Sequence, residues 1–141
     1  MILEHGPERF SLKIAGYQFP KASDDDWLVI LGEVRLTAGE WFFRDPSLTT
    51  FEIARLIDWL EALAAGAPTQ DWVDIVEPNI TFKRASPSTI RVSFWMESAP
   101  DWAKKDGRRP GFTLPIDERL AVAAAQLRAQ LAHFPHRGED D

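Results

Sequence analysis

The sequence of 141 residues contains no cysteine. It therefore forms no disulfide, offers no thiolate nucleophile and builds no zinc knuckle. It also lacks an apolar run of the roughly 20 residues needed to cross a bilayer, and its first residues lack the basic leader of a signal peptide. From these absences we expect a cytoplasmic protein.

Basic residues are scarce relative to acidic ones. Lysine and arginine number 16 and aspartate and glutamate 22, which gives a formal net charge of −6 at pH 7. An acidic chain is poorly suited to bind nucleic acid or an anionic membrane, and well suited to bind a basic protein.

Familiar cofactor and metal motifs are missing as well. The sequence has no GxGxxG, no P-loop and no HExxH motif. His133 and His136 have a spacing that suits one helix face, but Pro135 lies between them, so a metal site there is disfavoured. We expect no cofactor and no bound metal.

Alternation of apolar and polar residues predicts several strands. Phe10, Leu12 and Ile14 alternate with polar residues, and residues 27–36 and 41–43 read as a hairpin. Later, residues 80–83 and 90–96 alternate in the same way, with Ile90, Val92, Phe94 and Met96 on one face, and residues 112–114 suggest a short further strand.

Two segments have helical spacing. Thr49 and Glu52 form a capping box, and apolar residues at helical intervals continue to Gly66, which predicts a helix over about 49–65. A second helix is expected over about 117–134, with Asp117 as its N-cap and Pro135 as its limit. The order of elements predicts a single α+β domain over 1–141, an antiparallel sheet with both helices packed on it. We expect the acidic end to be frayed from about residue 138.

Paired carboxylates offer the best case for an enzyme. Glu97 lies on the outer face of its predicted strand, where Glu33 or Glu77 could stand opposite. Two carboxylates about 5–10 Å apart would suit a glycoside hydrolase, although acids on exposed strand positions more often serve solubility.

Six tryptophans are many for this length. Trp95 is out of phase with Phe94 and is expected on the opposite sheet face, and Trp102 falls in a loop, so both are candidate anchors for a partner. The acidic run Asp24–Asp26 is expected in an exposed turn and does not have the ligand spacing of a calcium loop. The basic run Lys104–Arg109 is expected to be a solvated loop.

Several short sequence segments, which we call landmarks, occur along the chain in a distinctive order. The first half contains Gly16–Pro20, Asp26–Leu28, Asp45-Pro46, Leu48-Thr49 and Trp59-Leu60; the second contains Glu77–Ile80, Glu97, Pro100, Trp102, Phe134-Pro135 and Arg137. This ordered set, from about Gly16 to Arg137, resembles the WapI family of bacterial immunity proteins.

The resemblance implies a non-catalytic inhibitor that binds the toxic C-terminal domain of a large secreted protein. In the system that gives the family its name, that domain resembles a nuclease acting on tRNA. An acidic inhibitor can compete electrostatically for a surface that binds polyanions. As partner-binding residues we predict Asp24, Asp25, Asp26, Trp95, Glu97 and Trp102. The alternatives are an adaptor domain that forms homo-oligomers and, third, a small carboxylate-based hydrolase.

Overall fold

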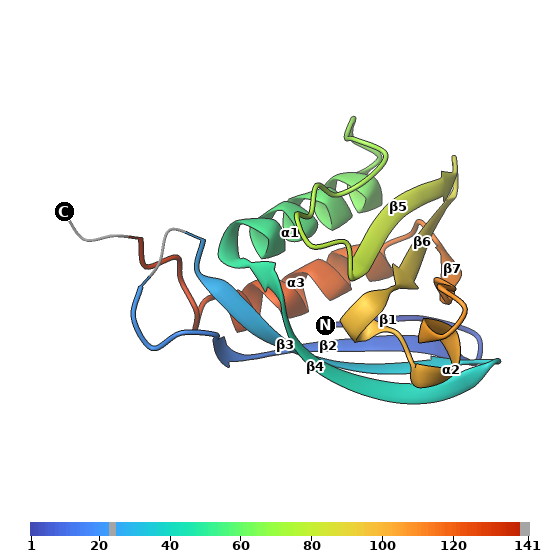
Figure 1. Cartoon of the computed structure of the whole chain (residues 1–141). Coiled ribbons are helices and arrows are strands. Elements are labelled where there is room, and N and C mark those ends of the chain that lie inside the picture. The colour runs from blue at the N-terminus through green and yellow to red at the C-terminus, as the bar shows by residue number, and fades with distance from the viewer. Residues whose placement is uncertain (23–24, 139–141) are drawn as a thin grey trace.

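The computed structural model describes residues 1–22 and 25–138 of the chain. Within these residues two antiparallel sheets pack with two longer helices, which confirms the α+β class (Figure 1). The predicted acidic end begins at Gly138, and its remaining residues fall outside the described ranges. No helix in the described ranges has both the length and the apolar character needed to span a membrane.

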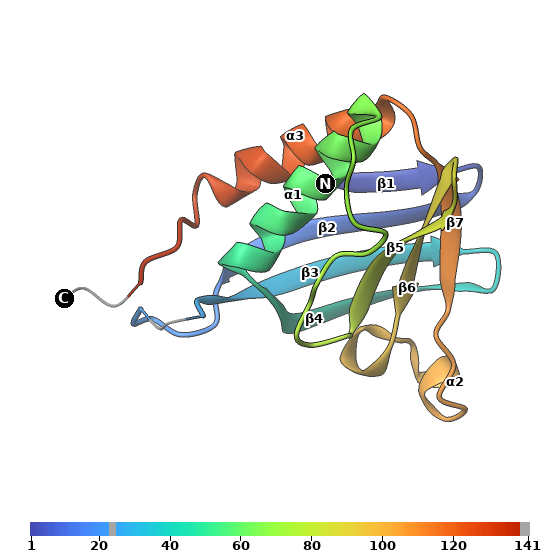
Figure 2. The same ribbon diagram turned by 90° about the horizontal axis from the view of Figure 1, so that it is seen from above.

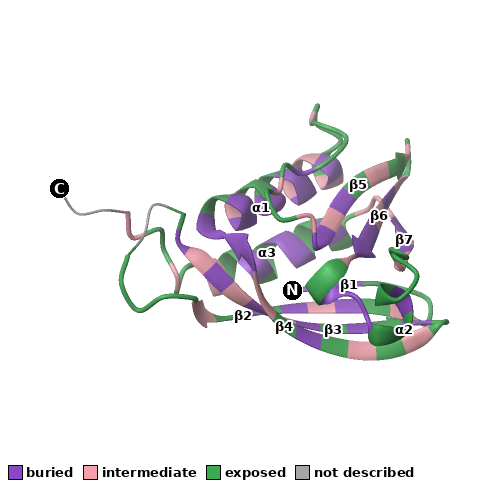
Figure 3. Cartoon of the chain, in the orientation of Figure 1, coloured by how far each residue is buried: buried purple, intermediate pink, exposed green. Residues whose placement is uncertain are grey.

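The first sheet is an antiparallel meander of four strands in the order β1-β2-β3-β4. The strands are β1 (Ile2–His5), β2 (Glu8–Tyr17), β3 (Trp27–Leu36) and β4 (Gly39–Thr49). The predicted alternation is visible in Figure 3, where buried and exposed positions follow one another along these strands. The register shifts between Ile14 and Gly16 and between Leu28 and Ile30. These irregularities lie at the end of the sheet where the 17–27 connection leaves it.

The second sheet has three strands in the order β5-β6-β7. They are β5 (Ile80–Ser86), β6 (Thr89–Phe94) and β7 (Gly111–Pro115). Seen from above, they run across the direction of the first sheet (Figure 2). The sequence predicts all of the strands except β1, but not their division between two sheets, because alternation gives the faces of a strand and not its partners.

The helices α1 (Thr50–Ala65) and α3 (Arg119–Leu131) lie on the same side of the first sheet (Figure 1). The predicted capping box of α1 is present, and Gly66 ends the helix in the left-handed region at φ 67°. The helix α3 begins at Arg119 with Glu118 as its N-cap, one residue later than the predicted cap Asp117. The Asp117 carboxylate still accepts a hydrogen bond from the Arg119 N–H at 2.9 Å.

Two short helices between β6 and β7 are not predicted by the sequence. They are the 3-10 turn η1 (Met96–Ser98) and α2 (Asp101–Lys104). The expectation that Met96 continues the inward face of β6 is wrong, because the strand ends at Phe94 and Met96 adopts φ 53° with its side chain exposed.

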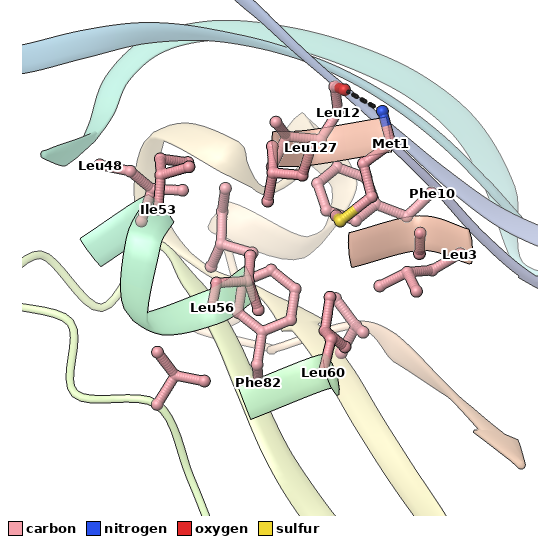
Figure 4. Packing of buried hydrophobic residues seen from close by; sticks show 14 of the residues in the cluster. Met1, Leu3, Phe10, Leu12, Leu48, Ile53, Leu56, Leu60, Phe82 and Leu127 are labelled. Atoms are coloured by element: carbon pink, nitrogen blue, oxygen red, sulfur yellow. Dashed lines mark hydrogen bonds between the residues drawn. The ribbon is translucent and has the colours of Figure 1, made fainter. Parts of the chain in front are cut away.

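Buried residues from both sheets and both longer helices form one hydrophobic cluster. Figure 4 shows Leu56 and Leu60 of α1 packed beside Phe82 of the second sheet, with Phe10 of the first sheet in the same cluster. The rings of Phe10 and Phe82 lie 6.5 Å apart, and Phe94 meets Phe10 edge-on at 4.9 Å. The strands packed in this shared core position the connecting segments on which the candidate site residues lie.

Candidate functional site

The three residues of the acidic run Asp24–Asp26, predicted to face a partner, do not share one environment. Asp24 lies outside the described residues, and Asp25 is exposed as expected. The expectation of an exposed turn is wrong for Asp26, which is fully buried with φ 44°. Its carboxylate is therefore a structural group rather than part of the surface.

Asp26 is buried because it binds Arg137 from the end of the described chain. The Arg137 guanidinium donates to Asp26 Oδ1 from Nε at 3.0 Å and from Nη2 at 2.7 Å, and the Arg137 backbone N–H donates to Oδ2 at 2.5 Å. Asp26 also has contacts beyond these. A buried carboxylate that accepts from both the guanidinium and the backbone N–H of one arginine fixes the two segments relative to each other.

The same guanidinium holds the first part of the connection that follows β2. It donates to the backbone carbonyls of Phe19, Pro20 and Lys21 at 3.1–3.2 Å. It also stacks 3.6 Å above the ring of Tyr17, whose hydroxyl donates to the Pro135 carbonyl. Arg137 thus ties the last described segment to residues 17–21 and to Asp26.

A turn after β6 carries Glu97 and Trp95. The Asn79 carbonyl accepts hydrogen bonds from the Trp95 N–H at 2.8 Å and from the Ser98 hydroxyl. Trp41 Nε1 donates to the Ser98 carbonyl at 2.8 Å. These bonds hold the left-handed Met96 in place and leave Glu97 exposed on the surface.

The two predicted anchor tryptophans already have cationic neighbours. Arg109 stacks 3.8 Å over the ring of half-buried Trp95, and Arg108 lies 5.4 Å from the ring of Trp102. Trp102 also meets Trp41 edge-on at 5.9 Å and remains 36% exposed. The basic run is exposed as predicted, but two of its arginines lie against these rings.

Glu97 faces a surface pocket of about 450 Å³, which we call the acidic pocket. Five separate segments contribute to its wall: the connection after β2, the start of β3, the middle of β4, the segment before β5, and η1. The residues that line it are Gln18, Phe19, Trp27, Asp45, Pro46, Glu77, Asn79 and Glu97.

The sequence left open whether Glu97 pairs with Glu33 or with Glu77, and the lining of the pocket distinguishes the two pairs. Glu77 and Glu97 line it together. Glu33 does not, because it lies on the outer face of the first sheet in a different pocket with Arg9, Arg35 and Glu40. The pairing of Glu97 with Glu33 is therefore wrong.

Asp45 and Asn79 are members of the pocket that sequence reasoning did not single out as site residues. Asn79 Nδ2 donates to Asp45 Oδ2 at 3.0 Å, and Ser47 Oγ donates to the same oxygen at 2.8 Å. Asn79 is 3% exposed, and its Oδ1 has no hydrogen-bond partner within the described part of the chain. The signal in the sequence is that both stand in the landmark segments quoted above.

The segment before β5 is fixed to the start of α1. The buried Glu52 accepts from the Thr49 N–H at 2.9 Å with Oε1 and from the Val76 N–H at 2.6 Å with Oε2. One carboxylate therefore caps the helix and holds the chain next to Glu77. In the described ranges no three His, Cys, Asp or Glu side chains are grouped so that they could hold a metal ion.

The structure thus defines a small α+β protein with an acidic pocket built where several segments meet. Over residues 1–135 the sequence matches the family described as the WapI-like immunity protein family, so the chain belongs to that family. The resemblance predicted from the landmark segments is confirmed; among those landmarks, Arg137 lies just beyond the matched range. No curated protein and no solved structure matches the chain.

Proposed function

We propose that this chain is a non-catalytic immunity protein that binds a cognate toxin domain in the cytoplasm and neutralises it by occlusion. The observation that carries the proposal is membership of the WapI-like immunity protein family over residues 1–135. We further propose that the toxin domain is basic, in keeping with a nuclease.

Two features of the molecule support a basic protein partner. The formal net charge is −6 at pH 7, and three carboxylates line the acidic pocket. Complementary charge accelerates encounter between proteins and selects among partners. Asp25 and Glu97 are exposed acids that can contact the partner, and the partly exposed Trp102 is an aromatic side chain that can do the same.

A growth-rescue experiment tests the proposal. The toxin domain encoded beside the gene for this chain is expressed in a sensitive cell, with this protein or with an unrelated acidic protein of similar size as the control. We expect growth only with this protein, and a stable one-to-one complex on light scattering of the purified mixture.

Growth arrest in the presence of well-expressed, folded protein contradicts the proposal. In that case an adaptor that forms homo-oligomers becomes the leading alternative, and the same light-scattering experiment on the protein alone reports it. Phe42, which is 83% exposed on the outer face of the first sheet, is the position at which such self-association would be probed.

A further inference from the structure

The acidic pocket differs in charge from the pocket on the outer face of the first sheet. Asp45, Glu77 and Glu97 line it, and no basic side chain is among the described residues in its wall. The pocket on the outer face of the first sheet instead mixes Arg9 and Arg35 with Glu33 and Glu40. Three carboxylates without an internal counter-charge attract a cation from outside.

The aromatic rings in the wall favour a flat cation over a compact one. Trp27 is half-buried and Phe19 is 51% exposed, so ring surface is available beside the carboxylates. A guanidinium group stacks on aromatic faces and bonds carboxylates with a planar fork, whereas an ammonium is a hydrated point charge. The chain uses this same pairing internally, where Arg137 lies over Tyr17.

Asn79 adds an acceptor of defined orientation. The Asp45 carboxylate accepts from Asn79 Nδ2, so the amide cannot be reversed without placing two oxygens against each other. Asn79 lines the pocket, and its Oδ1 is buried and has no partner within the described ranges. A buried acceptor that lacks a donor costs stability, and an incoming N–H group removes that cost.

The wall of the pocket is held in place from outside. Arg137 holds the carbonyl of Phe19, Glu52 holds the N–H of Val76 next to Glu77, and the Asn79 carbonyl holds Trp95 and Ser98. A site whose wall is already ordered loses little entropy when it binds.

We infer that the acidic pocket receives an arginine side chain from the surface of the toxin domain. The guanidinium lies among Asp45, Glu77 and Glu97 and stacks on the aromatic wall, and a small shift of the Asn79 amide opens its buried Oδ1 to one of the guanidinium N–H groups. This inference rests on the function proposed above and names the chemistry by which the partner is recognised.

The first experiment needs no toxin. The full chain is titrated with N-acetyl-L-arginine amide while NMR follows the side-chain amide of Asn79 and the indole N–H of Trp27. The matched probe is N-acetyl-L-citrulline amide, which has nearly the same shape and no charge. We expect saturable shifts at both groups with arginine only, and we expect them to disappear in the Glu77→Gln, Glu97→Gln double variant.

The second experiment measures the affinity of the complex with the neighbouring toxin domain. The pocket double variant is compared with Glu33→Gln, Glu118→Gln, which removes the same charge from exposed positions outside the pocket. We expect the pocket variant to bind about tenfold more weakly or worse, and the control variant to stay within about twofold of the unmodified chain.

The outcomes separate this inference from the proposed function. Equal affinity of both double variants for a toxin that binds the unmodified chain overturns the arginine pocket and leaves the immunity function standing. Equal shifts with arginine and citrulline overturn it as well. If the unmodified chain forms no complex, the proposed function fails and the assignment of a toxin arginine falls with it, while the NMR titration reports independently whether the pocket binds guanidinium.

Discussion

At the scale of single residues, Gly32 in the middle of β3 makes room for an aromatic ring. Its partner in the register is Phe43, and a Cβ at Gly32 would lie 2.2 Å from two atoms of that ring. Phe43 in turn stacks on Phe10 and contacts Phe94. The absence of a side chain at this position therefore shapes the aromatic centre of the core.

We predict that Gly32→Ala lowers the free energy of unfolding by about 1–3 kcal/mol, because the methyl group overpacks the site. Urea denaturation measures the loss. The double variant Gly32→Ala, Phe43→Leu should recover part of it, because the smaller side chain vacates the space that the methyl group needs. A Gly32→Ala chain as stable as the original contradicts this account.

Tyr17 is the only tyrosine of the chain, and its ionisation can be followed on its own. Burial raises its pKa above the ordinary value of 10.0; the charge of Arg137 opposes this effect and that of Asp26 adds to it. The folded state thus holds the phenol proton more tightly than the unfolded chain. The stabilisation that comes from this raised pKa of Tyr17 is complete below about pH 10. It is lost as the pH rises through the folded-state pKa.

We predict an absorbance titration midpoint above 10 for the native protein. Tyr17→Phe should cost about 1 kcal/mol near neutral pH, because the hydroxyl no longer donates to the Pro135 carbonyl. The difference in stability between the two chains should shrink as the pH rises through the Tyr17 pKa. A midpoint at or below that of a free tyrosine would contradict the assigned environment.

At the scale of elements, the start of α1 joins two parts of the fold. The capping box of Thr49 and Glu52 is predicted from the sequence because it depends on residues three apart. The second bond of Glu52, to the Val76 N–H, is invisible to such reasoning because its partner lies 24 positions away in a segment without periodicity.

We predict the order of stability Glu52, Glu52→Gln, Glu52→Ala, with the alanine variant about 2–3 kcal/mol below the original. Alanine leaves two backbone N–H groups without their acceptor, whereas glutamine retains one acceptor oxygen. Glu61→Ala serves as the control, because its bond to Arg128 is a surface pair worth about 1 kcal/mol or less. Hydrogen exchange should show the Val76 amide unprotected in the alanine variant; continued protection would contradict the role of Glu52.

Features that depend on residues close in sequence are predictable from the sequence, whereas contacts between distant segments are not. Local signals predict every strand except β1, both longer helices and the cap of α1. They miss η1 and α2, which are too short to show a period, and the burial of Asp26, which depends on Arg137 at the other end of the chain. For the site, the sequence suggested that Glu97 and Glu77 could meet, but not that Trp27, Asp45 and Asn79 join them.

At the scale of the whole molecule, the excess of acidic residues acts at a distance. Six net negative charges set a field that a basic partner senses before contact. This field changes mainly the rate of encounter, whereas the buried contacts of the complex set its lifetime.

We predict that the association rate with the toxin domain falls about tenfold or more between low and physiological salt. The dissociation rate should change much less. Stopped-flow mixing at several salt concentrations measures both rates. An association rate independent of salt would remove the electrostatic part of the proposed recognition while leaving the complex itself intact.

The tie between Asp26 and Arg137 has a consequence for the order in which the molecule forms. It joins positions 111 residues apart, whereas the meander of the first sheet is built from hairpins between neighbouring strands. Contacts so distant along the chain carry a large closure entropy and favour late formation. The wall that contains Phe19 is therefore among the last parts to be completed, so a chain that has not finished folding does not yet present the pocket.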